Sequence, residues 1–135
     1  MPQSLGLVLV VDDSQTIRDL IALNLELEGY DVVQAEDAFK ALDYLALVES
    51  GSKPMPQLML LDVVMPGLDG VQLTARLKAT RATAAIPILI VSASAQRRDF
   101  ELARGAGADG YLTKPFSPDE LLLEVARLIL PAGSA

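Results

Sequence analysis

Three aspartates, a serine and a lysine directly follow short apolar runs in this chain, and these side chains could bind a cation or take part in a transfer reaction. Asp12 and Asp13 follow LVLVV, Asp62 follows LMLL, Ser92 follows ILIV and Lys114 follows GYLT. Two unit charges 4 Å apart repel by about 4 kcal/mol at an effective dielectric near 20. If the carboxylates lie together, they therefore require a cation.

The residue inventory indicates which cation and which chemistry. The 135 residues contain neither His nor Cys, which excludes disulfides, thiolate nucleophiles, His-based triads and His- or Cys-ligated zinc. Lys114 can neutralise one carboxylate, but Asp12, Asp13 and Asp62 together exceed one ammonium group. Oxygen-only ligands suit a hard ion that keeps several waters, and Mg²⁺ fits best.

Length and composition indicate one globular domain, with a core over about 6–130 and a frayed tail at 131–135. Hydrophobic residues make up 51% of the chain, yet no run is long enough to span a bilayer and MPQSLG lacks the pattern of a signal peptide. We therefore expect a soluble cytoplasmic protein. The net charge of −7 argues against general binding to nucleic acid or to anionic membranes.

Hydrophobic periodicity predicts five strands alternating with five helices. The strands are expected near Leu7–Val11, Asp31–Ala35, Leu58–Leu61, Ile86–Val91 and Gly110–Leu112. The helices are expected from about Ile17 to Gly29, Ala38 to Leu45, Asp69 to Leu77, Gln96 to Arg104 and Ser117 to a stop at Pro131. Strict alternation predicts a parallel sheet covered on both faces, a three-layer doubly wound α/β fold.

Local signals mark several helix ends. Gly29 suits a left-handed cap, Asp69 and Gln72 have the spacing of a capping box, and Ser117 with Glu120 repeats it. The polar stretch 48–57 is interpreted as a solvent loop.

In an open parallel sheet, ligands bind beyond the carboxyl ends of the strands. Each polar residue also has a local explanation, since Asp13 or Ser14 could cap the first helix and Asp62 could begin a turn. These explanations leave unexplained why four of five strands deliver a polar group to one edge. We therefore predict a common site there.

Five motifs in order resemble a two-component response-regulator receiver domain, similar in layout to stand-alone chemotaxis-type regulators. They are VVDD, LLDVVMPGLDG, ILIVSA, GAGADGYL and LTKPF, and the resemblance covers about 7–130. It implies a flavodoxin-like strand order of 2-1-3-4-5.

The resemblance also implies a role for each site residue. Asp62 is the expected phosphoacceptor, and Mg²⁺ is expected on Asp13, Asp62 and the Val64 backbone carbonyl, with Asp12 acting through water. Lys114 and the Ser92 hydroxyl are expected to contact the phosphoryl group, and Tyr111 to report the switch. The Lys114–Pro115 bond is expected to be cis. Val64 and Ser94 occupy positions thought to tune loss of the phosphoryl group.

The expected partners are a sensor histidine kinase or a histidine phosphotransfer protein, because the chain has no His, and a downstream target protein. Phosphorylation is expected to shift the face formed by the fourth helix, fifth strand and fifth helix, with Arg97, Arg98 and Tyr111 as candidate contacts. Such a protein is a switch, not an enzyme, that catalyses only its own phosphoryl transfer and slow autodephosphorylation. We expect a monomer or weak dimer.

Other functions fit less well. A haloacid-dehalogenase-like phosphatase needs a second acid two residues after its nucleophile, but Ser14 stands two residues after Asp12. A flavodoxin-like electron carrier needs a phosphate-binding loop where Asp12 and Asp13 would repel the anion. A receiver-shaped interaction module that is never phosphorylated stays open as an alternative.

Overall fold

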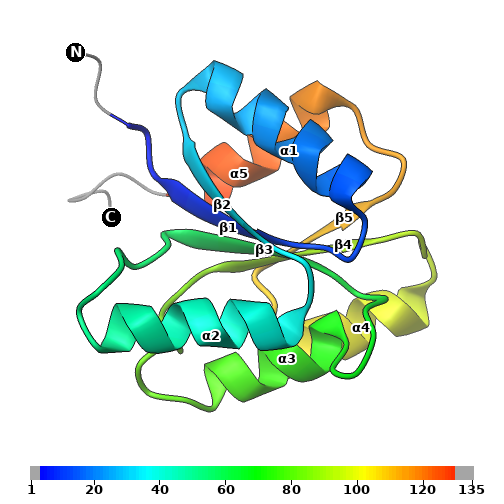
Figure 1. Ribbon diagram of the computed structural model, residues 1–135. Coiled ribbons are helices and arrows are strands. Elements are labelled where there is room, and N and C mark those ends of the chain that lie inside the picture. The colour runs from blue at the N-terminus through cyan, green and yellow to red at the C-terminus, as the bar shows by residue number, and fades with distance from the viewer. Residues whose placement is uncertain (1–3, 130–135) are drawn as a thin grey trace.

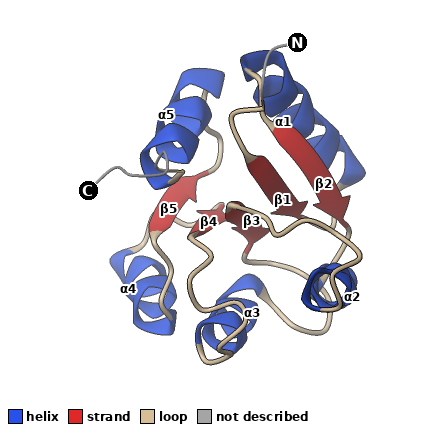
Figure 2. Ribbon diagram, turned by 90° about the vertical axis from the view of Figure 1, so that its left-hand side faces the viewer, coloured by secondary structure: helices blue, strands red, loops and turns tan. Residues whose placement is uncertain are grey.

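A computed structural model of the chain describes residues 4–129 and contains a five-stranded parallel sheet between two helical layers (Figure 1). The strands are β1 (Leu7–Val11), β2 (Asp31–Ala35), β3 (Leu58–Asp62), β4 (Ile88–Ser92) and β5 (Gly110–Thr113). The helices are α1 (Gln15–Glu28), α2 (Ala38–Glu49), α3 (Gly70–Lys78), α4 (Arg97–Ala106) and α5 (Pro118–Leu128). The strands lie in the order β2-β1-β3-β4-β5 (Figure 2). The predicted class and strand order are confirmed.

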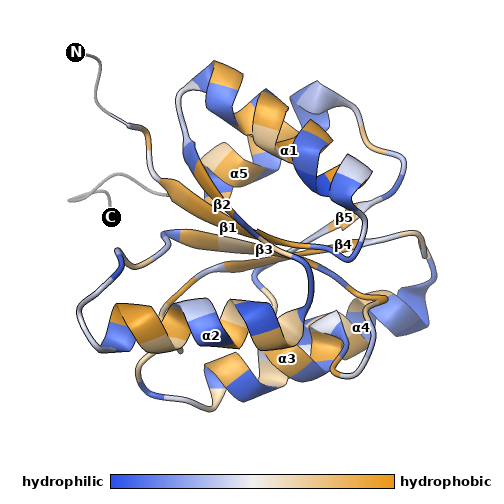
Figure 3. Ribbon diagram, in the orientation of Figure 1, coloured by the Kyte–Doolittle hydropathy of each residue, from blue (hydrophilic) through white to orange (hydrophobic). Residues whose placement is uncertain are grey.

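The two faces of the sheet form two separate cores because side chains alternate along each strand. On β1, Val8 and Val10 face α1 and α5, whereas Leu9 and Val11 face α2, α3 and α4. Figure 3 shows the mainly apolar strands between two layers of helices, along which polar and apolar residues alternate. Burial on both faces accounts for the nearly continuous apolar runs of β1, β3 and β4.

The predicted helix ends form through local hydrogen bonds. Ser14 caps α1, since its side chain accepts a hydrogen bond from Ile17 N–H at 3.3 Å. Gly29 ends α1 in the left-handed conformation with φ of 117°. Both predicted capping boxes are present, at the starts of α3 and α5. Each such cap contributes about 1 kcal/mol and fixes where the chain enters the helix.

Some boundaries differ from the sequence-based expectation. β4 begins at Ile88, two residues later than predicted, because Pro87 offers no N–H and the N–H of Ile86 closes a turn onto Thr83 O. α2 continues to Glu49, so that the predicted loop is shorter and starts at Ser50. The tail at 131–135, with the expected stop at Pro131, lies outside the described residues.

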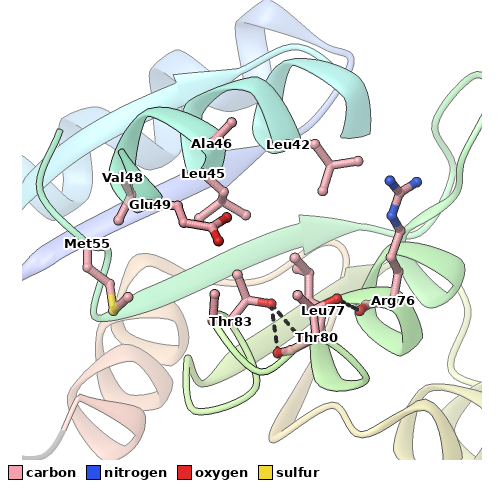
Figure 4. A pocket seen from close by; sticks show the side chains of 11 residues that line it. Leu42, Leu45, Ala46, Val48, Glu49, Met55, Arg76, Leu77, Thr80 and Thr83 are labelled. Carbon is pink, nitrogen blue, oxygen red and sulfur yellow. Dashed lines mark hydrogen bonds between the residues drawn. The ribbon is translucent and has the colours of Figure 1, made fainter. Parts of the chain in front are cut away.

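A groove of about 520 Å³ lies between α2 and α3 (Figure 4). Its apolar lining includes Leu45, Met55 and Leu77, and none of the polar residues that follow the strands contributes to it. In the part of the chain that the structure describes, no helix is long and apolar enough to cross a membrane.

Candidate functional site

Strand register brings the predicted site residues to one edge of the sheet. Val11 pairs with Leu61 across β1 and β3, so the residues that follow them, Asp12 and Asp62, leave the sheet at the same level. On the other side, Ser92 pairs with Thr113, the last residue of β5, and Lys114 comes next. Residues separated by up to 102 positions in sequence therefore meet at the carboxyl ends of four neighbouring strands.

The three aspartates and the lysine form a compact cluster. Carboxylate oxygens of Asp12, Asp13 and Asp62 all lie within 4.8 Å of one another. Lys114 Nζ lies 3.3 Å from Asp12 Oδ2 and 3.3 Å from Asp62 Oδ1. Asp12 and Asp62 are buried, at 1% and 6% exposure, whereas Asp13 is exposed. The lysine is thus shared by the two buried carboxylates, and the third carboxylate faces solvent.

The Asp12 backbone and side chain are held by α1. The Ser14 N–H donates to Asp12 Oδ1 at 2.9 Å, and the Arg18 guanidinium donates to the Asp12 carbonyl. Arg18 Nε also donates to Gln34 Oε1 on β2 at 3.2 Å. Sequence reasoning missed Arg18, although a charged residue one turn before Ile21 on the buried stripe of α1 was a usable signal. It ties the β1–α1 loop to the edge of the sheet.

Burial and like charge make the ionised form of Asp62 unfavourable. Desolvation raises the pKa of Asp62, the charge of Asp12 raises it further, and Lys114 and the Val64 backbone hydrogen bond act in the opposite direction. The net effect is an elevated pKa. A cation added to this cluster would therefore relieve repulsion that Lys114 leaves in place.

The donor set fits Mg²⁺. Three carboxylates offer only oxygen, and their span of 4.8 Å is one that a single hard cation can bridge with small side-chain adjustments. Among the residues that the structure describes, Asp12, Asp13 and Asp62 form the one group of three or more acidic side chains that lie close enough to share an ion.

Ser92 lies beside this cluster and connects to a second set of contacts. Its buried Oγ accepts a hydrogen bond from the Ser94 N–H at 3.0 Å. The Ser94 carbonyl accepts one from the Tyr111 hydroxyl at 2.8 Å, and Ser94 Oγ donates to Asp99 on α4. Tyr111 also packs edge-on against Phe100, with ring centroids 5.5 Å apart. Ser94 therefore contacts β4, α4 and β5, a role that its position alone did not reveal.

The remaining predicted residues lie in the β3–α3 loop, directly after β5 and at the start of α4. Val64 lies in the β3–α3 loop and is 75% exposed, and Lys114–Pro115 is cis, as the resemblance implied. Arg97 and Arg98 are both exposed at the start of α4, where Arg97 pairs with Glu101 at 3.0 Å.

Comparison with known proteins identifies the family. The family model described as "Response regulator receiver domain" matches residues 8–126. The chain belongs to this family. Receiver domains are signalling switches of two-component systems that interact with sensor histidine kinases and downstream targets, and the acidic pocket of this one fits an aspartyl phosphate and Mg²⁺.

Two curated relatives are transcriptional regulators. RpaA of Synechocystis, a "DNA-binding dual master transcriptional regulator", is 38% identical over 122 residues, which cover 90% of this chain and 48% of RpaA. The phosphate regulon transcriptional regulatory protein PhoB of Escherichia coli is 37% identical over 118 residues, which cover 87% of this chain and 49% of PhoB. This receiver domain thus spans about half the length of the curated relatives it matches.

Two solved structures match over nearly their whole length. A response regulator from Chloroflexus aurantiacus superposes with a TM-score of 0.82 at 31% identity, covering 92% of this chain and 97% of that one. The chemotaxis response regulator CheY4 of Vibrio cholerae superposes with a TM-score of 0.79 at 28% identity, covering 94% of this receiver domain and 99% of CheY4.

Proposed function

We propose that this receiver domain accepts a phosphoryl group on Asp62 from a phosphohistidine of a sensor kinase or histidine phosphotransfer protein, in a Mg²⁺-dependent reaction. The observation that supports this proposal most is the buried Asp62 carboxylate, placed against Lys114 within a cluster of three carboxylates. Asp12, Asp13, Asp62 and the Val64 carbonyl would hold Mg²⁺, which when bound supplies positive charge beside the phosphoryl oxygens.

Asp62 is the nucleophile of the transfer. One of its carboxylate oxygens attacks phosphorus and forms an O–P bond while the P–N bond to the donor imidazole breaks. The electron pair of the broken bond stays on the imidazole, which leaves as a neutral ring when its other nitrogen is protonated. No proton has to be removed from Asp62, because a carboxylate is nucleophilic as it stands.

Lys114 and Ser92 stabilise the charge that the phosphoryl group brings. The Lys114 ammonium already lies 3.3 Å from Asp62 Oδ1, where it can pair with a phosphoryl oxygen. The Ser92 hydroxyl accepts from Ser94 N–H, which leaves its own proton free to donate to another phosphoryl oxygen. Positioned donors of this kind contribute most of the catalysis in phosphoryl transfer.

Movement of Ser92 toward the phosphoryl group would be transmitted through Ser94. Ser94 contacts Ser92 through its N–H, Tyr111 through its carbonyl and Asp99 through its side chain. A shift of Ser92 therefore disturbs contacts on α4 and β5 together, which favours a change at the face of α4, β5 and α5 that alters the binding of a target protein.

The test is phosphorylation by a small donor. Incubation with Mg²⁺ and acetyl phosphate should add the mass of one phosphoryl group, located on Asp62 by peptide mapping, and EDTA should prevent the addition. A histidine phosphotransfer protein loaded with phosphate is the second donor. Failure with both donors would contradict the proposal and favour an interaction module that is never phosphorylated.

Val64→Asn is expected to speed loss of the phosphoryl group. The exposed Val64 side chain offers attacking water no hydrogen bond, whereas Asn does. One hydrogen bond contributes about 1 kcal/mol, which corresponds to an acceleration of about fivefold. Release of inorganic phosphate from the phosphorylated protein measures the rate. Val64→Leu, which stays apolar and bulky, is the control, and an unchanged or slower rate for Val64→Asn would reject the expectation.

A further inference from the structure

Gly70, the first residue of α3, lies against the backbone that carries Asp62. A Cβ atom built on Gly70 would lie 2.3 Å from the Asp62 carbonyl oxygen and 3.0 Å from both Asp62 C and Val63 Cα. Separations below 3.0 Å are essentially never seen for real Cβ atoms, and all three neighbouring atoms belong to the main chain. No side-chain rotation can therefore relieve the overlap.

Backbone torsion does not explain this glycine. The glycines with positive φ in the described part of the chain are Gly6, Gly29, Gly51, Gly67 and Gly107, and Gly70 is not among them. Any L-residue could adopt the conformation of Gly70. Glycine is required at this position by the close approach of two main-chain segments, the end of β3 and the beginning of α3.

Hydrogen bonds hold these segments together. The Gly70 N–H donates to the Val63 carbonyl at 3.0 Å, and the Val63 N–H donates to the Val91 carbonyl on β4 at 3.2 Å. The fully buried Thr74 hydroxyl donates to the Gly70 carbonyl at 2.7 Å and braces the first turn of α3. Val63, the residue that follows Asp62, is thus held to β4 through its N–H and to α3 through its carbonyl.

We infer that Gly70 is a positioning residue for Asp62: its lack of a side chain lets α3 press against the strand end and keep the Asp62 carboxylate near Asp12 and Asp13. This inference rests on the proposed function of Asp62. In Gly70→Ala the two segments must separate by about 0.7 Å to reach 3.0 Å. Misplacement of a reacting group by about 1 Å can slow a reaction about 100-fold.

Gly70→Ala is therefore expected to weaken Mg²⁺ binding about tenfold and to slow phosphorylation by acetyl phosphate by about 10- to 100-fold at saturating Mg²⁺. Isothermal titration calorimetry gives the Kd for Mg²⁺, and intact mass against time gives the rate. Both are measured at a temperature where circular dichroism finds every variant folded. A glycine needed only for stability would lower Tm but leave the Kd and this rate at their parent values.

Gly105→Ala is the matched control. Gly105 lies on α4 with no atom within 4 Å of an added Cβ, so this variant should keep the parent Kd and rate. Thr74→Val serves if Gly70→Ala does not fold, because it removes only the hydroxyl that braces Gly70. In Thr74→Val the Kd for Mg²⁺ should rise, and the phosphorylation rate should fall, by about threefold to fivefold. Loss of one hydrogen bond corresponds to a change of this size.

The outcomes separate this inference from the proposed function. A folded Gly70→Ala with parent values of Kd and rate overturns the inference, as do parent values in Thr74→Val when Gly70→Ala is unfolded. A parent protein that is not phosphorylated on Asp62 overturns the proposed function instead. The Kd for Mg²⁺ still tests in that case whether Gly70 positions the carboxylate.

Discussion

Asp62→Asn is expected to take up no phosphoryl group from acetyl phosphate and, without metal, to unfold at a temperature a few degrees above that of the parent protein. The first effect follows because an amide oxygen does not replace the carboxylate nucleophile. The second follows because the substitution removes a buried charge that desolvation and Asp12 both disfavour. Loss of function should therefore accompany a gain in stability.

The stability gain has a defined pH dependence. The folded-state pKa of Asp62 is raised, so the protonated carboxyl is the form that folding favours. In the parent protein, the stability contributed by protonated Asp62 is present at pH values below the unfolded pKa and is lost as pH rises through the folded pKa. Asparagine resembles the protonated carboxyl at every pH. The difference in Tm should thus be largest at neutral pH and shrink as pH falls through the raised pKa.

Thermal melting of both proteins in EDTA, repeated across pH, measures this difference. Asp43→Asn is the control, because it removes one negative charge from the exposed surface of α2 and should leave Tm within about one degree of the parent. Mg²⁺ should raise the Tm of the parent more than that of Asp62→Asn. A metal-free Asp62→Asn that melts below the parent at neutral pH would contradict the electrostatic explanation.

Lys114→Met is expected to destabilise the metal-free protein by about 3 kcal/mol, because removal of one partner leaves buried charges uncompensated. Lys114 Nζ lies 3.3 Å from both Asp12 and Asp62. Its loss should lower Tm by roughly 10 °C in a domain of this size. The remaining carboxylates should bind Mg²⁺ at least about tenfold more tightly, since a competing positive charge is gone.

Phosphorylation should nevertheless be slower in Lys114→Met, because the ammonium no longer stabilises the phosphoryl oxygens. Urea unfolding in EDTA, calorimetric titration with Mg²⁺ and the rate with acetyl phosphate test the three effects. Lys53→Met, in the exposed loop before β3, removes the same charge at a remote position and should change none of them. Weaker Mg²⁺ binding by Lys114→Met would mean that the lysine orders the carboxylates more than it competes with the metal.

Features encoded by neighbouring residues could be predicted from the sequence. Ser117 and Glu120 are three residues apart, so their reciprocal hydrogen bonds form wherever that helix lies in the fold. The strands β1 and β2 were predicted to the residue, because turn residues and charges bound their apolar runs. The start of β4 was not, because the hydrogen bonds available beside Pro87 come from other parts of the fold.

Family motifs extended this reach to the strand order, and they indicated which residues to examine as a candidate site. The motifs gave the residue types, but they left open that Lys114 is shared by Asp12 and Asp62. They also left open that Asp13 is the exposed member of the three clustered aspartates. They also gave no sign of the buried Arg18 beneath the β1–α1 loop.

By itself the sequence determined which segments form helices and strands, which faces are apolar and which polar groups stand at strand ends. These properties depend on side chains a few positions apart. Only the tertiary structure decided how far each carboxylate is desolvated and which charged groups lie beside it. The tertiary structure also leaves no space for a Cβ atom at position 70. Those properties depend on distances between segments separated by up to a hundred residues, and packing of both cores against one sheet sets these distances.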